Sequence, residues 1–212
     1  MMKLPNRAAG LILVAFAATT LAGRAADSEF RSILHGNDLS AFDLIGLGAD
    51  SITVENGEIR VSGTPNGYFA TKKSYKNYVL KFGWKYDRPA DLQDDRKFEG
   101  NSGLLVHIKS PHKVWPRCVE VQLFHQDAGN IFGVDGAKFQ GKKDAEAQRK
   151  AIKRVGEWNE MEVTCRDGAI TCKLNGVEVC RGSAADPSSG TIGWQSEGSP
   201  IHFRKLEIQE LD

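Results

Sequence analysis

Residues 120–126 (EVQLFHQ) carry side chains whose types and spacing suit binding and proton-transfer chemistry. If this segment is a strand, its period of two places four of them on one face: Glu120, Gln122, Phe124 and Gln126. A carboxylate and two amides exchange hydrogen bonds with hydroxyl groups, and an aromatic ring stacks on an apolar C–H face. The pattern therefore indicates a surface suited to a sugar.

A second segment, residues 101–108 (NSGLLVHI), reads as another strand. Its alternation places Gly103, Leu105 and His107 on a common face. If that face adjoins the first one, His107 and Glu120 converge as an acid/base pair. The same pattern also fits an ordinary solvated sheet face without a site, and the residues alone leave both interpretations open.

The rest of the chain has the pattern of turns and short strands that is typical of an all-β protein. Its 22 glycines separate short alternating segments, and Asn56-Gly57 is a strong hairpin signal. The expected strands and hairpins are residues 52–61, 78–86, 102–109 and 119–126, a three-stranded meander over 161–180, and 201–211. Only residues 142–153 are helix-like, in a long loop between strands. The number of half-buried strands predicts a two-sheet antiparallel β-sandwich.

The N-terminal residues have the order of a secretory signal peptide. Lys3 and Arg7 precede an uncharged, mostly apolar run over 11–21, and small residues follow it. Cleavage after Ala22 or after Ala25 fits equally well, and an uncleaved N-terminal anchor is the alternative. The sequence thus predicts a signal peptide over residues 1–25 and one domain over 26–212, exported to the periplasm or the extracellular space. No membrane insertion is expected after cleavage.

The overall charge gives no reason to expect a polyanionic partner. The formal net charge is +1, from 28 basic and 27 acidic residues. One local basic stretch, residues 138–154, is interrupted by Asp144 and Glu146 and has no accompanying ladder of aromatic residues for base stacking. A solvated loop is the better interpretation, and no nucleic acid is expected as a partner.

The sequence does not decide whether its four cysteines form disulfides or remain free thiols. In an exported chain they could form two disulfides, but Cys165 and Cys172 share the parity of apolar neighbours, so buried free thiols fit as well. Their spacing is not a zinc signature. The pairing is left undecided for Cys118, Cys165, Cys172 and Cys180.

Eight segments, in order along the chain, resemble the 3-keto-disaccharide hydrolase family, whose fold is a concanavalin A-like jelly roll. Together they cover nearly all of the chain after the predicted signal peptide. The segments are residues 34–42, 54–59, 101–103, 120–122, 156–159, 174–177, 190–195 and 203–208.

The resemblance implies which residues line the site. It marks Asn101, Glu120, Gln122 and Gln195 as polar groups that contact the substrate, with Phe124 added from the strand pattern, whereas Trp194 points into the core. There are two departures from the family pattern. His107 stands where the family usually has Arg, and Glu197 stands where it often has His, and both bear on the substrate and on whether catalysis is retained.

The family name implies cleavage of a glycoside that carries a ketone at C3. The ketone acidifies the C2 proton, so a base can form an enolate and expel the C1 substituent, after which water adds. We expect Glu120 or His107 as the base, and a bound divalent cation or Asn101 and Gln122 as the group that stabilises the enolate. The metal ligands and the acid for the leaving group stay unassigned.

Two other readings bear on this expectation. Ordinary glycoside hydrolysis needs two carboxylates at a set separation, and residues 120–124 offer only one. A non-catalytic, lectin-like carbohydrate-binding module is the alternative to an enzyme, because the same fold serves both. The aglycone, the linkage and the oligomeric state are not determined by the sequence.

Overall fold

The computed structural model describes Met1 and residues 29–212. The predicted signal peptide therefore lies, apart from Met1, outside the described residues. Within the described part of the chain, no helix combines the length and the apolar composition needed to cross a bilayer.

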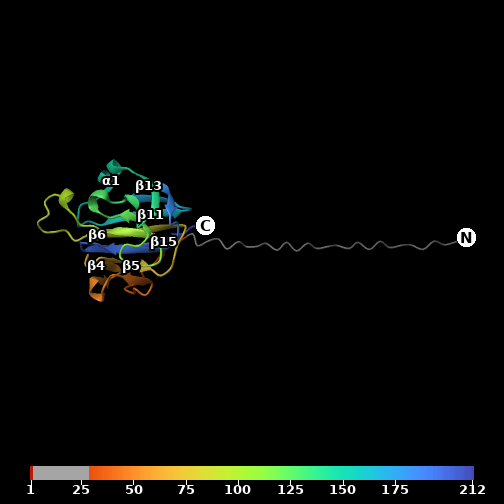
Figure 1. The fold of residues 1–212 in the computed structure, drawn as a ribbon, viewed down its shortest axis with the longest axis horizontal. Coiled ribbons are helices and arrows are strands. Elements are labelled where there is room, and N and C mark those ends of the chain that lie inside the picture. The colour runs from red at the N-terminus through yellow and green to blue at the C-terminus, as the bar shows by residue number, and fades with distance from the viewer. Residues whose placement is uncertain (2–28) are drawn as a thin grey trace.

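Two antiparallel sheets, one of nine strands and one of six, form the body of the protein (Figure 1). The larger sheet runs, in spatial order, through β10 (Lys138–Lys143), β13 (Val177–Asp186), β12 (Ala169–Leu174), β11 (Asn159–Arg166), β6 (Tyr78–Tyr86), β15 (Ile201–Glu210), β4 (Glu58–Val61) and β3 (Ile52–Glu55), with β1 (Arg31–Ser32) also on β15. The smaller sheet runs through β2 (Phe42–Ile45), β5 (Gly67–Thr71), β14 (Thr191–Ser196), β7 (Gly103–Ile108), β8 (Cys118–Gln122) and β9 (Ile131–Val134).

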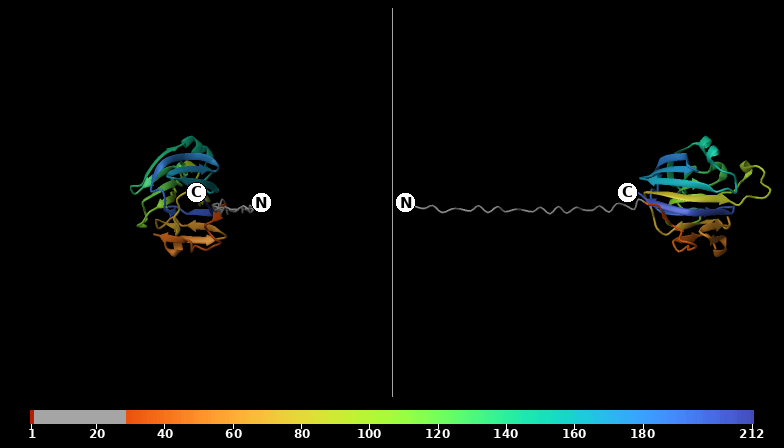
Figure 2. Two further views of the ribbon diagram at one scale, coloured as in Figure 1. Left: turned by 90° about the vertical axis from the view of Figure 1, so that its right-hand side faces the viewer. Right: turned by 180° about the vertical axis from the view of Figure 1, so that it is seen from behind.

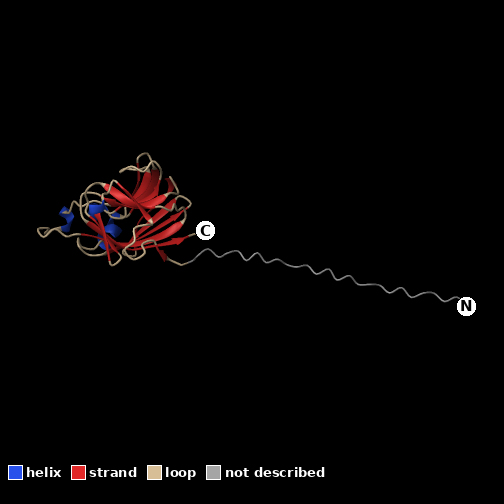
Figure 3. Ribbon diagram, turned by 90° about the horizontal axis from the view of Figure 1, so that it is seen from below, coloured by secondary structure: helices blue, strands red, loops and turns tan. Residues whose placement is uncertain are grey.

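Helices are few and short, so strands dominate the fold (Figure 3). They are α1 (Ala145–Ala151) and the 3-10 turns η1 (Ala49–Ser51), η2 (Asp95–Lys97) and η3 (His125–Asp127). Because β1 pairs with β15, the described part of the chain begins and ends side by side (Figure 2). The predicted all-β sandwich is confirmed.

The core lies between the two sheets and is rich in aromatic rings. Phe69 and Trp194 of the smaller sheet stack with their centroids 5.2 Å apart, and Phe69 meets Phe203 of the larger sheet edge-on at 5.7 Å. Alternation explains this arrangement, since every second residue of a strand points to the same side. Trp194 is therefore a core residue, as expected, and Gln195 points away from the core.

The predicted meander is confirmed, and its turns have the expected chemistry. Asp167-Gly168 and Asn175-Gly176 both adopt positive φ at their two central residues, as two-residue hairpin turns require. The helix is shorter than predicted. Lys142 and Lys143 belong to β10, and α1 begins only after Asp144, whose carboxylate accepts hydrogen bonds from the amides of Glu146 and Ala147.

All four cysteines are buried and free: Cys118, Cys165, Cys172 and Cys180. The question left open by the sequence is thus answered in favour of thiols. Cys165 and Cys172 face the main core, as their parity indicated.

Candidate active site

The candidate site lies on the outer face of the six-stranded sheet, opposite the main core. Leu104 and Val121 belong to the core between the sheets, so their neighbours Gly103 and Glu120 must face outward. The outer face has a small apolar cluster of its own, formed by Tyr68, Ala70, Leu105, Ile108 and Cys118. Polar groups gather at one side of this cluster.

Glu120 is fixed at the centre of this polar group. It lies on β8 between Leu105 of β7 and Phe132 of β9, and only 6% of its surface is exposed. Gly103 leaves room for its carboxyl group. A Cβ atom at that position would lie 2.5 Å from Glu120 Oε1 and 2.2 Å from Gln195 Oε1. The Glu120 carboxyl and the Gln195 amide therefore meet over a glycine that any side chain would displace.

Gln195 has an unusual environment. Its side chain is 1% exposed, and its Oε1 atom is buried without a hydrogen-bond donor. The strand that carries it is held firmly, because the Ser102 hydroxyl donates to the Gln195 carbonyl at 2.9 Å. A buried acceptor without a donor is uncommon and is a place where a ligand or a protonated neighbour can bind.

Asn101 and Glu197 complete the group at the next position along these strands. The two residues form an isolated antiparallel bridge, and the Asn101 amide donates to the Glu197 carboxylate. Asn101 Oδ1 is buried without a partner. Glu197 follows Gln195 by two residues and is half-buried on the same face. The sequence showed Glu197 only as a departure from the family pattern, and it is a second carboxyl group of the site.

The two carboxyl groups influence each other. Burial first, and the charge of Glu197 second, raise the pKa of Glu120 from 4.5 to about 8. Burial also raises the pKa of Glu197, and the hydrogen bond from Asn101 opposes that shift. A pair of carboxyls with unequal pKa values is a typical arrangement for proton transfer.

The contacts of Gln122 and Phe124 differ from the prediction, although Gln122 pairs with Gly103 across the strands. Strand β8 ends at Gln122, whose Oε1 accepts from the amides of Leu123 and Phe124 at 2.9 and 2.8 Å. The chain then enters η3, with Phe124 just before it, so the alternation that placed Phe124 beside Glu120 stops two residues earlier. The amide NH2 group of Gln122 remains available as a hydrogen-bond donor on the outer face. The position of Phe124 is not the one that the strand pattern predicted.

The structure does not bring His107 to Glu120. Thr191 pairs with Ile108 and Gly193 with Leu105, so β7 carries one extra residue between these pairs. His107 adopts φ of 59° at this bulge, and its ring turns inward to meet Tyr78 edge-on at 5.9 Å. Its Nδ1 lies 3.2 Å from the Pro187 carbonyl oxygen, and burial lowers its pKa to about 4. The predicted pairing of His107 with Glu120 is wrong for this reason.

Tyr68 is a site residue that the sequence analysis missed. It pairs with Gln195 across the strands, is fully buried, and has a hydroxyl without a hydrogen-bond partner. Its strand, residues 67–71 (GYFAT), is short and buried on both faces, so it shows no alternation to reveal it. Burial, followed by the nearby Cys118, raises the pKa of Tyr68 to about 12.

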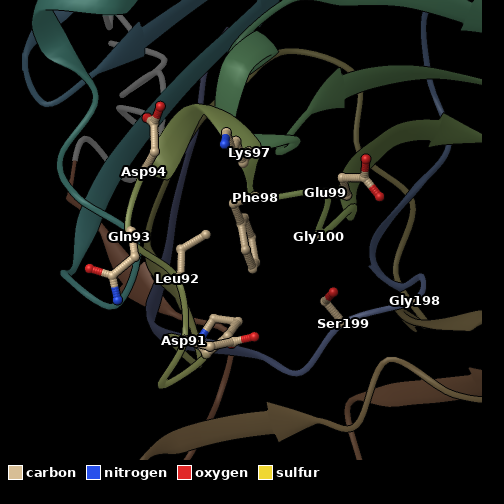
Figure 4. A pocket seen from close by; sticks show the side chains of 11 residues that line it. Asp91, Leu92, Gln93, Asp94, Lys97, Phe98, Glu99, Gly100, Gly198 and Ser199 are labelled. Carbon is tan, nitrogen blue, oxygen red and sulfur yellow. The ribbon is translucent and has the colours of Figure 1, made fainter.

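A cavity of about 660 Å³ adjoins the site. Its wall includes Gly100 and Gly198, the chain neighbours of Asn101 and Glu197. Figure 4 shows the Phe98 ring lying between Leu92 and Ser199 in this cavity. The carboxyl group of Glu120 is not part of its lining, so the cavity lies beside the polar group and not over it.

The loop that walls the cavity is held in place by hydrogen bonds. Arg88 donates to Asp95 at 2.7 Å and to the carbonyls of Leu92 and Val155 at 2.9 and 3.1 Å. Gln126, expected on the face of Glu120, instead donates to the carbonyls of Asp95 and Phe98. Gln126 therefore supports the loop.

Within the described residues, no three His, Cys, Asp or Glu side chains gather in a way that could hold a metal ion. The divalent cation considered from the sequence therefore has no such ligand cluster among these residues.

The fold is a jelly-roll sandwich, and the candidate site is a cluster of carboxyl and amide side chains on the outer face of one of its sheets. Residues 29–209 match the family described as the 3-keto-alpha-glucoside-1,2-lyase-like domain, and the chain belongs to that family. A search of curated proteins finds no match.

Solved structures with the same fold are distant in sequence. Two are candidate glycosyl hydrolases from Parabacteroides distasonis, with 23% and 20% identity and TM-scores of 0.65 and 0.64. The matched regions cover 86% and 87% of this chain and 100% and 95% of those two chains, respectively. A carbohydrate-binding module from Bacillus subtilis has 10% identity and a TM-score of 0.55, covering 80% of this chain and 96% of its own. At these identities the likeness shows the fold.

Proposed function

We propose that this protein cleaves glycosides whose sugar carries a ketone at C3, by elimination across C1 and C2 followed by addition of water. The observation that carries the proposal is the buried Glu120 carboxyl beside Glu197, within a group of amides. Membership of the 3-keto-alpha-glucoside-1,2-lyase-like family supports the choice of substrate.

The chemistry requires groups that the site contains. A C3 ketone makes the C2 proton acidic, so a carboxylate can remove it, and a carboxylic acid can protonate the departing C1 oxygen. The negative charge that forms on the C3 oxygen needs hydrogen-bond donors, and the free amide NH2 group of Gln122 is one. Glu120 takes part in proton transfer, and the hydroxyl of Tyr68 and the amide of Gln195 bind the sugar.

The direct test is turnover of a 3-keto-α-glucoside by the protein over residues 26–212 in deuterated water. Elimination through an enolate predicts release of the aglycone and deuterium at C2 of the sugar product. Glu120→Gln keeps the shape of the side chain and removes its acid/base function, so the rate should fall ~10²–10⁴-fold.

Glu146→Gln is the matched control, because Glu146 is exposed on α1 and pairs only with Lys150. Its rate should equal that of the wild type. Aglycone release without deuterium at C2 would contradict the enolate route, and no turnover of any 3-keto glycoside would contradict the proposal as a whole.

A carbohydrate-binding module without catalysis is the second candidate, and the structural likeness to such a module from Bacillus subtilis favours it. In this case the protein binds unmodified oligosaccharides without converting them. Glu120→Gln would then weaken binding by ~1–3 kcal/mol, the usual cost of a lost partner for a buried polar group. Calorimetric titration with unmodified and 3-keto sugars distinguishes the two functions.

Export is part of the proposal. The charged and apolar pattern of residues 1–25 supports secretion, with residues 26–212 as the mature protein. Mass spectrometry of the protein recovered outside the cytoplasm should find an N-terminus near residues 23–26. A chain that retains Met1 there would contradict the proposed processing.

A further inference from the structure

The proposed elimination needs one group to take a proton and another to give one. The outer face offers two carboxyl groups, Glu120 and Glu197, and the two differ in the hydrogen-bonding groups around them. These differences indicate which carboxyl carries the proton before the reaction.

Glu197 is placed to be ionised. The Asn101 side-chain amide donates a hydrogen bond to its carboxylate, and a donated hydrogen bond favours the charged form. Glu197 is also half-buried, so solvent reaches part of its side chain. The hydrogen bond and the remaining solvent contact favour the charged form, and they oppose burial, which raises the pKa of Glu197.

Glu120 is placed to be protonated. The nearest polar atom across Gly103 is Gln195 Oε1, an acceptor that is buried without a donor. A protonated carboxyl can donate to this oxygen, whereas a carboxylate would set two acceptors against each other. Burial of Glu120, with 6% of its surface exposed, also opposes a charge there.

The remaining titratable groups near the pair stay neutral. Cys118 lies on the same face of β8, and Tyr86 of β6 lies in the core, where its hydroxyl donates to the Leu123 carbonyl. Burial raises the pKa of both groups, so neither adds a charge near pH 7. The pKa of about 8 for Glu120 agrees with one proton on Glu120 and one charge on Glu197.

Building on the proposed function, we propose that Glu197 is the base that takes the C2 proton and that Glu120 is the acid that protonates the departing oxygen. This assigns a catalytic role to Glu197, which entered the sequence analysis only as a departure from the expected family pattern. It also gives Glu120 the opposite role from the one expected from the sequence.

The two proton transfers balance. The C2–H bond breaks, its proton goes to the Glu197 carboxylate, and its electron pair forms the enolate of the C3 ketone. The enolate then forms the C1–C2 double bond while the C1–O bond breaks, and the departing oxygen takes the proton of Glu120. The products are an unsaturated 3-keto sugar and the free alcohol.

Addition of water reverses the roles. Ionised Glu120 removes a proton from the water that attacks C1, and protonated Glu197, whose half-buried carboxyl group exchanges its proton with solvent, gives a solvent-derived proton to C2. Both groups regain their starting state, and no oxidant or reductant is consumed.

The test compares Glu197→Gln with Glu120→Gln on 3-keto glucosides with two kinds of leaving group. A nitrophenolate departs without protonation, whereas a sugar alcohol needs an acid. Glu120→Gln should slow release of the sugar alcohol ~10²–10⁴-fold and release of nitrophenol far less. Exchange of the C2 proton with deuterated water should continue in this variant.

Glu197→Gln should slow both substrates alike and abolish C2 exchange. Glu197→Asp, which keeps a carboxylate, should recover part of the exchange, and Glu146→Gln should match the wild type. The opposite pattern, with exchange lost in Glu120→Gln and retained in Glu197→Gln, would overturn the assignment. Equal losses of exchange in both variants would also overturn it. Failure of the wild type to convert either substrate would instead contradict the proposed function.

Discussion

His107 and Glu120 are buried titratable residues on neighbouring strands of one sheet, but they lie in different regions. His107 points between the sheets, where its ring packs against Tyr78 and its Nδ1 meets a backbone carbonyl. Glu120 points to the outer face, where it meets a second carboxyl and an amide oxygen without a donor. Burial shifts both pKa values toward the neutral form.

The difference shows what distinguishes a candidate site from a packed core position. The surroundings of His107 are mostly apolar and aromatic, and they favour a neutral ring, whose Nε2 atom is buried without a hydrogen-bond partner. The surroundings of Glu120 are polar groups with unused hydrogen-bonding capacity, and a glycine keeps space open next to them. Changes in the first region should affect stability, and changes in the second should affect function.

The largest effect is expected at Gly103, on the outer face. Gly103→Ala places a methyl group 2.2 Å from Gln195 Oε1 and 2.5 Å from Glu120 Oε1, so both side chains must move. Displacement of a catalytic group by about 1 Å can cost ~10²-fold in rate, and we expect a loss of that order in turnover of a 3-keto glucoside. Both obstructing atoms are the ends of flexible side chains, so the variant should still fold.

Gly48→Ala is the control, because an added Cβ there meets only Ser51 Oγ at 3.8 Å. It should keep the wild-type rate. A fully active Gly103→Ala would mean that Glu120 and Gln195 need not hold the positions described.

The next effect concerns the stability of the core region. His107→Asn suits the positive φ of this position but removes the ring that packs on Tyr78. The free energy of unfolding should fall by ~2–4 kcal/mol, as for other large-to-small changes in a core. Turnover per folded molecule should stay unchanged.

Urea unfolding and an activity assay measure the two quantities separately. His112→Asn, at an exposed position in the loop after β7, should change neither. A His107→Asn variant with normal stability and lost activity would contradict this comparison, because it would show that His107 is needed for function and not for packing.

The smallest effect is the pH dependence of stability, which should have opposite signs in the two regions. The pKa of Glu120 is raised from 4.5 to about 8, so its contribution is fully present below pH 4.5 and is lost as the pH rises through 8. The pKa of His107 is lowered from 6.5 to about 4, so its contribution is present above pH 6.5 and is lost as the pH falls through 4. Within its pH range, each group should change the free energy of unfolding by at most ~1.4 kcal/mol per pH unit.

Unfolding curves at pH 4, 6 and 9 separate these contributions. Glu120→Gln should reduce the loss between pH 6 and 9, and His107→Asn should reduce the loss between pH 6 and 4. If the free energy of unfolding of either variant depends on pH as it does in the wild type, other groups cause the pH dependence.

Alternation along strands explains how much could be predicted from the sequence. It gave the sandwich, the meander, the inward Trp194 and the outward Glu120 and Gln195, because these residues lie within regular strands. It failed at His107 and Phe124, where a bulge and an early strand end interrupt the period of two. Neither interruption has a local signal such as Gly or Pro at the residue concerned.

Other parts of the site could not be seen because they depend on contacts between distant segments. Asn101 meets Glu197 across 96 positions of the chain, and Gly103 matters only because Gln195 and Glu120 approach it. Tyr68 was missed since a strand buried on both faces shows no pattern of exposure. Glu120→Gln, Glu197→Gln and Gly103→Ala test the roles of three of these residues, and the roles of Asn101, Gln195 and Tyr68 remain predictions.

The four free thiols have a consequence for recovery from denaturant. Since no covalent cross-link joins them, an unfolded chain has no native pairing to restore, although its exposed thiols can form non-native pairs if they oxidise. Burial raises the pKa of Cys118, Cys165, Cys172 and Cys180, so in the folded protein they remain protonated and react slowly with oxidants. Renaturation should therefore give the same yield with and without a reducing agent, provided that oxidation of the exposed thiols is prevented while the chain is unfolded.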